Sequence, residues 1–300
     1  MAETIYKGSN SAVKIASTVI PRVQEFSIDT DRQTEAEYEL GNLSPSGTSS
    51  GSWSYTGRMA FNPISTLAER AIIGQSASAN YVVKLADLMT ATPVAITTVG
   101  AGITGAVVTG VSYSVSVPNG KWSCNMDFKA AGISGITTVT APAVAGVGAF
   151  RAKHIFARFE SLASNLLRIK SLTLNAGFSA EDLYQLSSGD AFAIDNTQPN
   201  VTAEIEWYWV TESVNPGTNA TDYRPILEDA SGEDIEIQVV PTGIGTDWDD
   251  VGNIRIMLNN MTTNRRAMSV ATGSQGTHRL SYISGGDSTT YGWSVDVIGT

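Results

Sequence analysis

Acidic side chains alternate with apolar ones in two separate segments of the chain. Glu35, Glu37 and Glu39 follow this pattern in the first half, and Glu204 and Glu206 follow it in the second. Because the side chains of a β-strand point alternately to its two faces, each segment is predicted to have one acidic and one apolar face. Such a face is either an ordinary water-facing surface or the wall of an aqueous channel. In a channel, carboxylates repel phosphates and keep a passing polyanion from sticking.

Two short motifs match catalytic or nucleotide-binding patterns, but neither has the context that its chemistry needs. Residues 47–51 (GTSSG) match G-x-S-x-G, yet they stand in a Ser/Gly-rich segment, not between a buried strand and a helix. The base of a triad would have to be His154 or His278, and each is predicted in or beside a strand. Residues 100–105 (GAGITG) match G-x-G-x-x-G but precede a predicted strand, so we expect a turn there. We expect no enzymatic activity.

Hard oxygen ligands gather at residues 247–250 (DWDD), which form either a calcium site or a solvated acidic turn. The segment lacks the ligand spacing of a known calcium loop, which favours the turn. Cys124 is the only cysteine, so an internal disulfide and a zinc site with several cysteines are both excluded. We therefore expect no cofactor and no bound metal.

The composition predicts an acidic, globular chain of two domains. It has 300 residues, 42% apolar and 16% charged, which suits two domains of about 150 residues each. The net charge of −10 disfavours a grip on nucleic acid, which needs clustered Lys and Arg, although an acidic protein can face DNA that it must not hold. The apolar runs are far shorter than a membrane span, and the first ten residues lack a signal-peptide pattern. We expect a soluble, unsecreted protein with no membrane partner.

The two halves of the chain resemble each other at a fixed spacing. Residues 22–41 align without a gap with residues 168–187, since 168 − 22 = 146. The identities at this spacing are Glu35/Glu181, Tyr38/Tyr184, Leu40/Leu186 and Thr56/Thr202. Apolar positions also keep their phase; chance and a shared β composition are the alternative explanation. We predict a duplicated β-module, and two similar surfaces on one chain favour a pseudo-symmetric ring.

Alternating and β-branched segments predict strands through most of the chain. In the first half they are expected at residues 12–17, from 22 onward, and at 35–40, 53–61, 81–85, 94–99, 106–117 and 121–128. In the second half they are expected at residues 156–161, from 168 onward, and at 181–186, 201–209, 235–240, 254–258, 267–271 and 278–283. One helix is expected at residues 63–74, with Pro63 near its start and Gly74 at its end.

These elements divide the chain into a first module, residues 1–131, and a second module, residues 151–300. Residues 132–150 between them are rich in Gly, Ala, Thr and Val and carry no charge. They form either a flexible linker or an extended arm that packs on a neighbour, and we favour the arm for a protein that assembles.

The order of the elements resembles the phage tail-tube protein family. The resemblance rests on a short strand and hairpin (AVKIAS, VIPRVQEFSID), a strand with a long Ser/Gly-rich loop (EAEYELGNLSPSGTSSGSW), a return strand (YTGRMAF), a short helix and further strands. It implies a mainly β fold of two tandem tube modules, each a β-sandwich or barrel with a short flanking helix. Two modules in one chain imply trimeric, pseudo-sixfold rings. Stacked rings would form the tail tube of a virion, assembled in the host cytoplasm, which conducts the DNA genome into the host.

The resemblance also implies which residues form the sites. The residues expected to face an acidic lumen are Glu35, Glu37, Glu39, Arg58, Glu181, Glu204 and Glu206. The residues expected in the loop that contacts the adjacent ring are Gly41, Asn42, Ser44, Pro45, Gly47, Ser49 and Gly51. The second loop departs from the first because it carries Phe192 and Ile194, so the two loops are expected to have different partners.

The implied partners are other copies of the chain, DNA that passes without specific binding, and other tail proteins such as a sheath, a terminator or a baseplate hub. Two alternatives stay open. The same fold forms the inner tube of contractile injection machines, and a sheath gene beside this one would identify that case. A two-domain capsid decoration or adhesin protein would stay monomeric or form rings that never stack.

Overall fold

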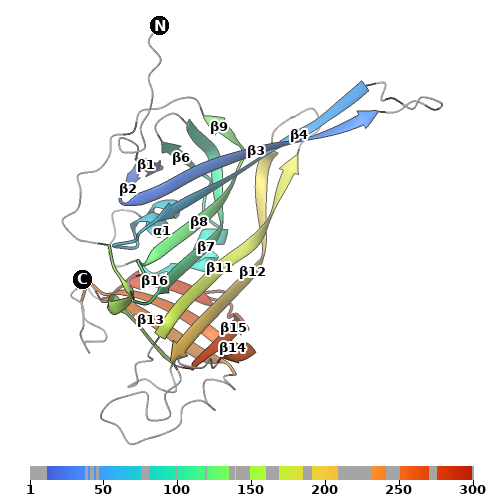
Figure 1. The fold of residues 1–300 in the computed structure, drawn as a ribbon. Helices are drawn as coiled ribbons and strands as arrows, with labels where there is room; N and C mark the ends of the chain where they lie inside the picture. Colours follow the sequence, from blue (N-terminus) through green and yellow to red (C-terminus); the bar gives the residue numbers. More distant parts are fainter. Residues whose placement is uncertain are drawn as a thin grey trace, which may run out of the picture.

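The computed structural model shows a mainly β protein whose strand pairings are all antiparallel (Figure 1). It describes residues 12–37, 40, 44, 47–75, 81–98, 101–118, 120–134, 139, 149–159, 169–184, 191–208, 231–240, 251–269 and 276–298. The mainly β class that the alternating segments predict is confirmed. Among the described residues, no helix is long and apolar enough to cross a membrane.

The first half of the chain contains the two short α-helices of the described structure. Its elements are β1 (Val13–Ile15), β2 (Thr18–Ile20), β3 (Val23–Glu37), β4 (Gly47–Phe61), α1 (Leu67–Ile72), β5 (Val83–Lys84), α2 (Leu85–Met89), β6 (Val94–Thr98), β7 (Ala101–Ser116), β8 (Ser123–Ala130) and β9 (Gly132–Ser134). The elements of the second half are η2 (Ala152–His154), β10 (Ile155–Phe159), β11 (Ile169–Tyr184), β12 (Ala191–Tyr208), β13 (Glu233–Val239), β14 (Ile254–Ser269), β15 (Thr277–Ser284) and β16 (Trp293–Val297).

The strands of the two halves pair in the same order. In the first half the order is β1-β6-β7-β8-β4-β3, and in the second half it is β10-β13-β14-β15-β12-β11. The beginning of the longest central strand has a further partner in each half, β9 on β7 and β16 on β14. The pairing of β7 with β11 joins the halves into one sheet of sixteen strands.

The long hairpins β3–β4 and β11–β12 share their register as well as their order. Corresponding pairs are Val23–Phe61 and Ile169–Trp207, Glu25–Ala60 and Ser171–Glu206, and Arg32–Trp53 and Phe178–Pro199. Each hairpin has one bulge after its first pair and another after its Arg32 or Phe178 pair. The spacing is 146 residues in both strands, since 169 − 23 = 146 and 199 − 53 = 146.

The central pairs β7–β8 and β14–β15 match in the same way. Corresponding pairs are Val108–Phe128 and Thr263–Tyr282, Gly110–Asp127 and Arg265–Ser281, and Ser114–Ser123 and Ser269–Thr277. Each long strand skips one residue, Thr109 in β7 and Asn264 in β14, so their spacing is 264 − 109 = 155. A bulge at the same place in both pairs gives both strands the same local bend.

One apolar core runs through both halves. Its largest fully buried side chains include Trp122 and Phe128 from the first half and Phe159, Tyr282 and Trp293 from the second. Every second residue of β8 and β10 is buried, whereas the first four residues of β16, from Trp293 to Asp296, are all buried. Full burial of one such apolar side chain stabilises the fold by about 1.5–3 kcal/mol.

Several strands are longer than the sequence predicts. β3 is one strand where two were expected, and β14 likewise joins the segments expected at 254–258 and 267–271. β4 begins at Gly47 instead of Trp53, so residues 47–52 are strand and the expected loop is shorter. The turn expected at residues 100–105 is wrong, because β7 begins at Ala101 and pairs there with β6 and β9.

The helices also differ from expectation. The expected helix at residues 63–74 is present as the shorter α1, with Ala68 and Ala71 buried. Helix α2 was missed, since its start was predicted as a strand. The backbone N–H of Lys84 donates to the carboxylate of Asp87 over 3.0 Å, and Leu85 and Leu88 enter the core. In the described part of the second half, the only helical element is the 3-10 turn η2.

Candidate functional site

The sheet has a polar face opposite its core face. On β4, Met59 and Phe61 are buried while Arg58 is exposed, as the alternation predicts. On β12, Ile205 is buried and its neighbours Glu204 and Glu206 are half-buried on the other side. The sequence therefore assigns these charged residues to the correct face, because parity along a strand is a local property.

The charges on this face are paired across strands, so the face is not uniformly acidic. The pairs are Arg58–Asp127 at 3.5 Å, Lys129–Asp182 at 3.2 Å, Lys170–Glu206 at 2.8 Å and Arg279–Glu204. Burial raises the pKa of Glu206, but hydrogen bonds from Lys170, Thr277 and Ser171 outweigh it and hold that pKa below its usual range. Arg58 lies on β4, where sequence parity placed it, but Lys129, Lys170 and Arg279 come from β8, β11 and β15. Parity along one strand does not reveal these partners.

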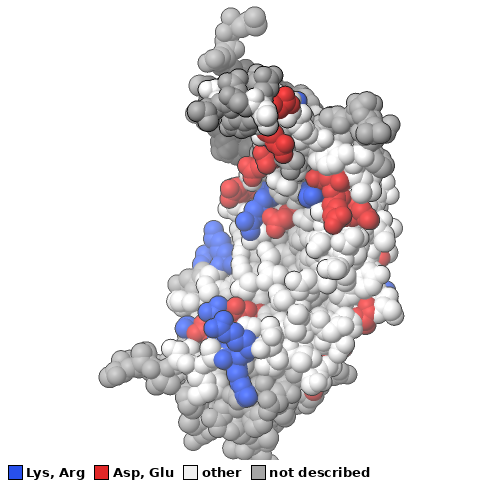
Figure 2. Space-filling model, turned by 90° about the vertical axis from the view of Figure 1, so that its right-hand side faces the viewer, with Lys and Arg blue, Asp and Glu red and all other residues white. Residues whose placement is uncertain are grey.

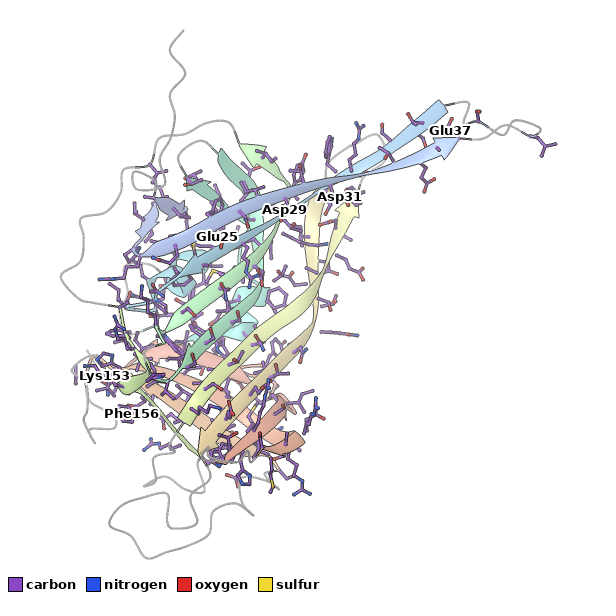
Figure 3. All side chains as sticks on the ribbon, viewed as in Figure 1. Glu25, Asp29, Asp31, Glu37, Lys153 and Phe156 are labelled. Carbon is purple, nitrogen blue, oxygen red and sulfur yellow. The ribbon has the colours of Figure 1, made fainter. Side chains whose placement is uncertain are left out.

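Further acidic side chains follow β3. Glu25, Asp29 and Asp31 are exposed and lie in succession along the strand, with Glu37 toward its tip (Figure 3). Beyond Asp31 the β3–β4 hairpin projects from the sheet as a two-stranded arm (Figure 3). Glu35 and Ala36 point to opposite faces of this arm and both are exposed, so here both faces meet solvent.

The other predicted residues of the arm have varied placements. Gly47, Ser49 and Gly51 lie in β4. Ser44 lies in an exposed bend. Glu181, an expected lumen residue, is exposed near the end of β11, and it lies opposite Asp195 of β12 in the strand register. The residues Glu39, Gly41, Asn42 and Pro45, and the acidic segment 247–250, lie outside the described residues.

Aromatic and cationic contacts hold the base of the arm. The Arg32 guanidinium lies 5.1 Å from the ring centre of Trp53, and its Nε donates to the carbonyl of Gly51 over 3.2 Å. The Tyr184 hydroxyl donates to the carbonyl of Trp53 over 3.1 Å, which ties the end of β11 to the β3–β4 arm. Cation–π contacts at exposed sites contribute about 0.5–1 kcal/mol. The sequence alone does not show that Arg32 and Tyr184 both contact Trp53.

Basic side chains gather where β14 meets β15. Arg265 and Arg279 line a cavity of about 140 Å³ together with Glu204, Ala267 and Ser281. Arg279 pairs with Glu204, whereas Arg265 has no ion pair with a described residue. Figure 2 shows acidic side chains in the upper part of one face of the molecule and a column of basic ones in the lower part.

The most perturbed titratable groups are enclosed in the core. Tyr113 donates to Glu69 over 2.5 Å, and both residues are buried. Burial raises the pKa of Glu69, and burial together with nearby Glu69 raises the pKa of the Cys124 thiol well above its usual range. A buried thiol held in its protonated form is a poor nucleophile. This cluster is part of the packing and offers no reaction site.

The tested catalytic and metal patterns do not come together. His278 is buried with its ring stacked on Trp207, at 6.0 Å between ring centres, and His154 accepts a hydrogen bond from the backbone N–H of Arg151. Neither histidine contacts Ser49 in the described structure. No group of three or more His, Cys, Asp or Glu among the described residues could hold a metal ion.

Comparison with models of protein families finds no match for this chain, and comparison with curated protein sequences finds none either. The sheet order, the arm and the charge distribution therefore carry the functional argument.

Proposed function

We propose that this chain is a structural subunit of a viral tail tube, built from two copies of one β-module. The observation that carries the proposal is the common strand order of the halves, with matching bulges in both long hairpins and both central pairs. A common composition accounts for strands in general, but it does not account for two bulges at the same positions. Within this proposal, each module is one unit of a pseudo-sixfold ring of three chains.

The arm and the polar face support a tube in particular. The β3–β4 arm extends away from the sheet, so its tip can reach a ring stacked above or below (Figure 1). The polar face would line the lumen, with Glu204 and Glu206 already held by Arg279 and Lys170. Phosphates then find few cations that lack a carboxylate partner, so DNA would slide past without specific binding.

Native mass spectrometry and negative-stain microscopy of the full chain test the assembly. We expect rings of three chains that stack into filaments in the virion tail. Monomers alone at high concentration, or rings of six chains, would contradict the proposal. Closed rings that never stack would instead indicate a capsid decoration or adhesin protein.

Charge reversal tests the lumen. The double variant Glu204→Lys, Glu206→Lys should still assemble, but each added cation creates a phosphate contact, so assembled tubes should retain DNA in a salt-dependent way. Filter binding at several salt concentrations measures this retention. The double variant Glu204→Gln, Glu206→Gln is the matched control, because it removes both carboxylates without adding a cation. Equal DNA retention by the lysine double variant and the parent would place these glutamates outside the lumen.

A further inference from the structure

Two strand edges are open in the described structure. β3 pairs with β4 on one side, and no described strand pairs with its other edge. From Arg265 to Ser269, β14 pairs with β15, and again no described strand lies on the other edge. Exposed edges of this kind are templates for pairing with another chain.

The chain already contains a junction of the same kind. β7 pairs with β11 through the residues that correspond to these two edges. β11 corresponds to β3 at a spacing of 146 residues, and β14 corresponds to β7 at a spacing of 155, as the shared bulges establish (169 − 23 = 146; 264 − 109 = 155). The internal pairs therefore give a register for the open edges: Gly110–Gly177, Val111–Ala176, Ser112–Asn175, Tyr113–Leu174 and Ser114–Thr173.

We propose that β3 of one copy pairs antiparallel with residues 265–269 of β14 in a second copy of this chain. Transfer of the internal register gives five opposed pairs, Asp31–Arg265, Thr30–Arg266, Asp29–Ala267, Ile28–Met268 and Ser27–Ser269. The interface deepens the proposed function and rests on it, since it treats the halves as two copies of one module. It joins the end of one chain's sheet to the start of the next and is heterologous, as a ring requires.

Charge and apolar surface both fit this register. Asp29 and Asp31 on the β3 edge are exposed, and none of the described residues forms an ion pair with either (Figure 3). Arg265 on the other edge is also exposed and forms no ion pair with a described residue. The register places it opposite Asp31, with Asp29 diagonal to it. Met268 is 59% exposed on an edge strand and comes opposite Ile28. The corresponding internal residues, Tyr113 and Leu174, are both buried.

One position must differ from the internal junction. A Cβ atom on Gly177 would lie 2.9 Å from the carbonyl oxygen of Thr109, so the internal strands approach closely where two glycines face each other. Asp31 and Arg265 occupy these positions at the open edges. The strands must therefore lie farther apart at that end than β7 and β11 do, and the longer arginine side chain spans the gap.

Cysteine cross-linking tests the register in the full chain. In the variant Asp29→Cys, Ala267→Cys the two sulfurs come from directly opposed residues of different copies, within the reach of a disulfide. Mild oxidation should link most chains into dimers and closed trimers on a non-reducing gel. The variant Ser112→Cys, Asn175→Cys is the matched internal control, and its disulfide should form within one chain. The variant Thr30→Cys, Ala267→Cys moves one cysteine by one residue, so the two side chains point to opposite faces of the sheet. Its cross-linking should be at least tenfold lower.

The outcomes separate this inference from the proposed function. Rings with the internal disulfide but no link between positions 29 and 267 would overturn the β3–β14 interface and leave the ring intact. Stronger linking in the slipped variant would overturn the register. Monomers without any link between copies would overturn both proposals.

A charge exchange gives a second readout without cysteines. Asp31→Arg alone should shift the chain from rings toward monomers at least tenfold at low salt, because it places two cations opposite each other. Asp31→Arg combined with Arg265→Asp should restore the rings. Failure of the double variant to recover, with its fold intact by circular dichroism, would contradict the Asp31–Arg265 pairing.

Discussion

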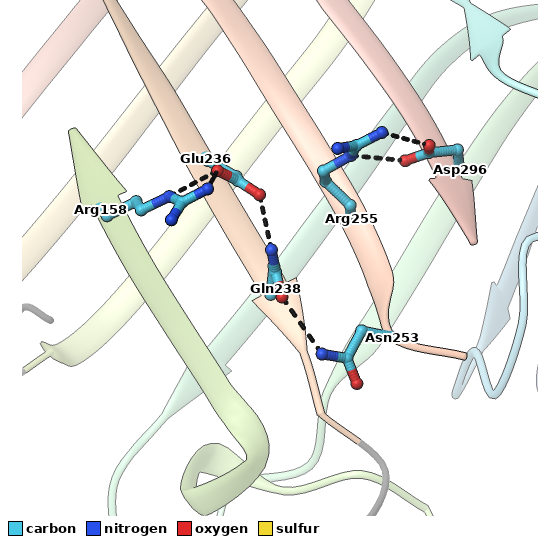
Figure 4. Close-up of polar contacts among 6 residues, drawn as sticks. All are labelled: Arg158, Glu236, Gln238, Asn253, Arg255 and Asp296. Carbon is cyan, nitrogen blue, oxygen red and sulfur yellow. Dashed lines mark hydrogen bonds and ion pairs between the residues drawn. The ribbon is translucent and has the colours of Figure 1, made fainter. Parts of the chain in front are cut away.

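At the scale of single residues, two kinds of polar group have different consequences. Glu69 is buried with one hydrogen-bond partner, Tyr113, and its second carboxylate oxygen has no partner among the described residues. Asp296 is also buried, but Arg255 donates two hydrogen bonds to it, at 2.6 and 3.0 Å (Figure 4). Glu69 therefore makes the stability of the fold depend on pH, whereas Asp296 makes it depend on the side chain of Arg255.

Glu69 should lower stability as the solution becomes more basic. Burial raises the pKa of Glu69 above 4.5 in the folded protein, so the folded state keeps its proton at pH values where the unfolded chain has lost it. The free energy of unfolding should therefore fall as pH rises from 4.5 toward the raised pKa. Glu69→Gln should lose this part of the pH dependence and exceed the parent in stability at pH 8. Urea unfolding between pH 4 and 8 measures it.

Tyr113→Phe is the companion variant, because it removes the hydrogen bond that favours the charged form of Glu69. Its stability should fall more steeply with pH than that of the parent. Identical pH profiles for all three proteins would show that Glu69 does not titrate in this range.

Arg255→Met should destabilise the protein by about 2–4 kcal/mol, because it leaves the Asp296 carboxylate buried without its main partner. Arg58→Met is the matched control, since Arg58 and Asp127 form a pair with side chains 55% and 50% exposed. The control should cost under about 1 kcal/mol. Denaturant unfolding distinguishes the two, and equal costs would mean that burial of Asp296 does not matter.

At the scale of elements, polar rows and close backbone contacts hold the strands in place. Arg158, Glu236, Gln238 and Asn253 form a chain of hydrogen bonds across β10, β13 and the start of β14, and Gln238 is fully buried (Figure 4). Such a row fixes the register of neighbouring strands, because a slip by one residue would leave buried polar groups without partners. At the β7–β11 junction no polar row is needed, because two facing glycines let the two backbones approach closely.

Gly177→Ala should weaken the β7–β11 junction. The new methyl group would lie 2.9 Å from the Thr109 carbonyl oxygen and 3.3 Å from Gly110 Cα, and backbone atoms there cannot move without shifting the sheet. We expect a loss of about 1–3 kcal/mol in thermal unfolding. Gly47→Ala is the control, because its methyl group would meet only the flexible Glu37 side chain at 3.6 Å. A tolerated change at Gly177 would contradict the tight junction.

At the scale of the whole molecule, one core and one sheet join the two halves, while the β3–β4 arm stands apart from both (Figure 1). Ring closure and ring stacking should therefore depend on different parts of the chain. In the proposed tube, closure would depend on the sheet edges and stacking on the arm.

Deletion of residues 41–46, which link β3 to β4, should leave three-chain rings but shorten or abolish filaments. The reason is that the deletion removes only residues between the two strands of one hairpin, and such connections tolerate shortening. Native mass and filament length by microscopy give the two readouts. A matched deletion of residues 185–189, between β11 and β12, shows whether the second hairpin contributes equally. Filaments of normal length after the first deletion would exclude the arm from stacking.

The sequence alone determined the β class, the faces of the strands and the spacing at which the two long hairpins correspond. Met59, Phe61 and Ile205 enter the core where alternation places them, because side-chain parity depends only on the neighbouring residues of one strand. The sequence predicted the ends of the strands less well. Residues 101–105 follow a glycine pattern typical of a turn, yet hydrogen bonds from β6 and β9 hold them in β7.

Only the tertiary structure decided which side chains meet. The pairs Arg279–Glu204 and Lys129–Asp182 join strands far apart in sequence, so the acidic rows predicted from one strand become a face of paired charges. The open edges of β3 and β14 likewise follow from the sheet order, which no local pattern contains. The physical reason is that strand pairing is non-local. A period of two residues says which way a side chain points, and the neighbour across the sheet is set by the path of the whole chain.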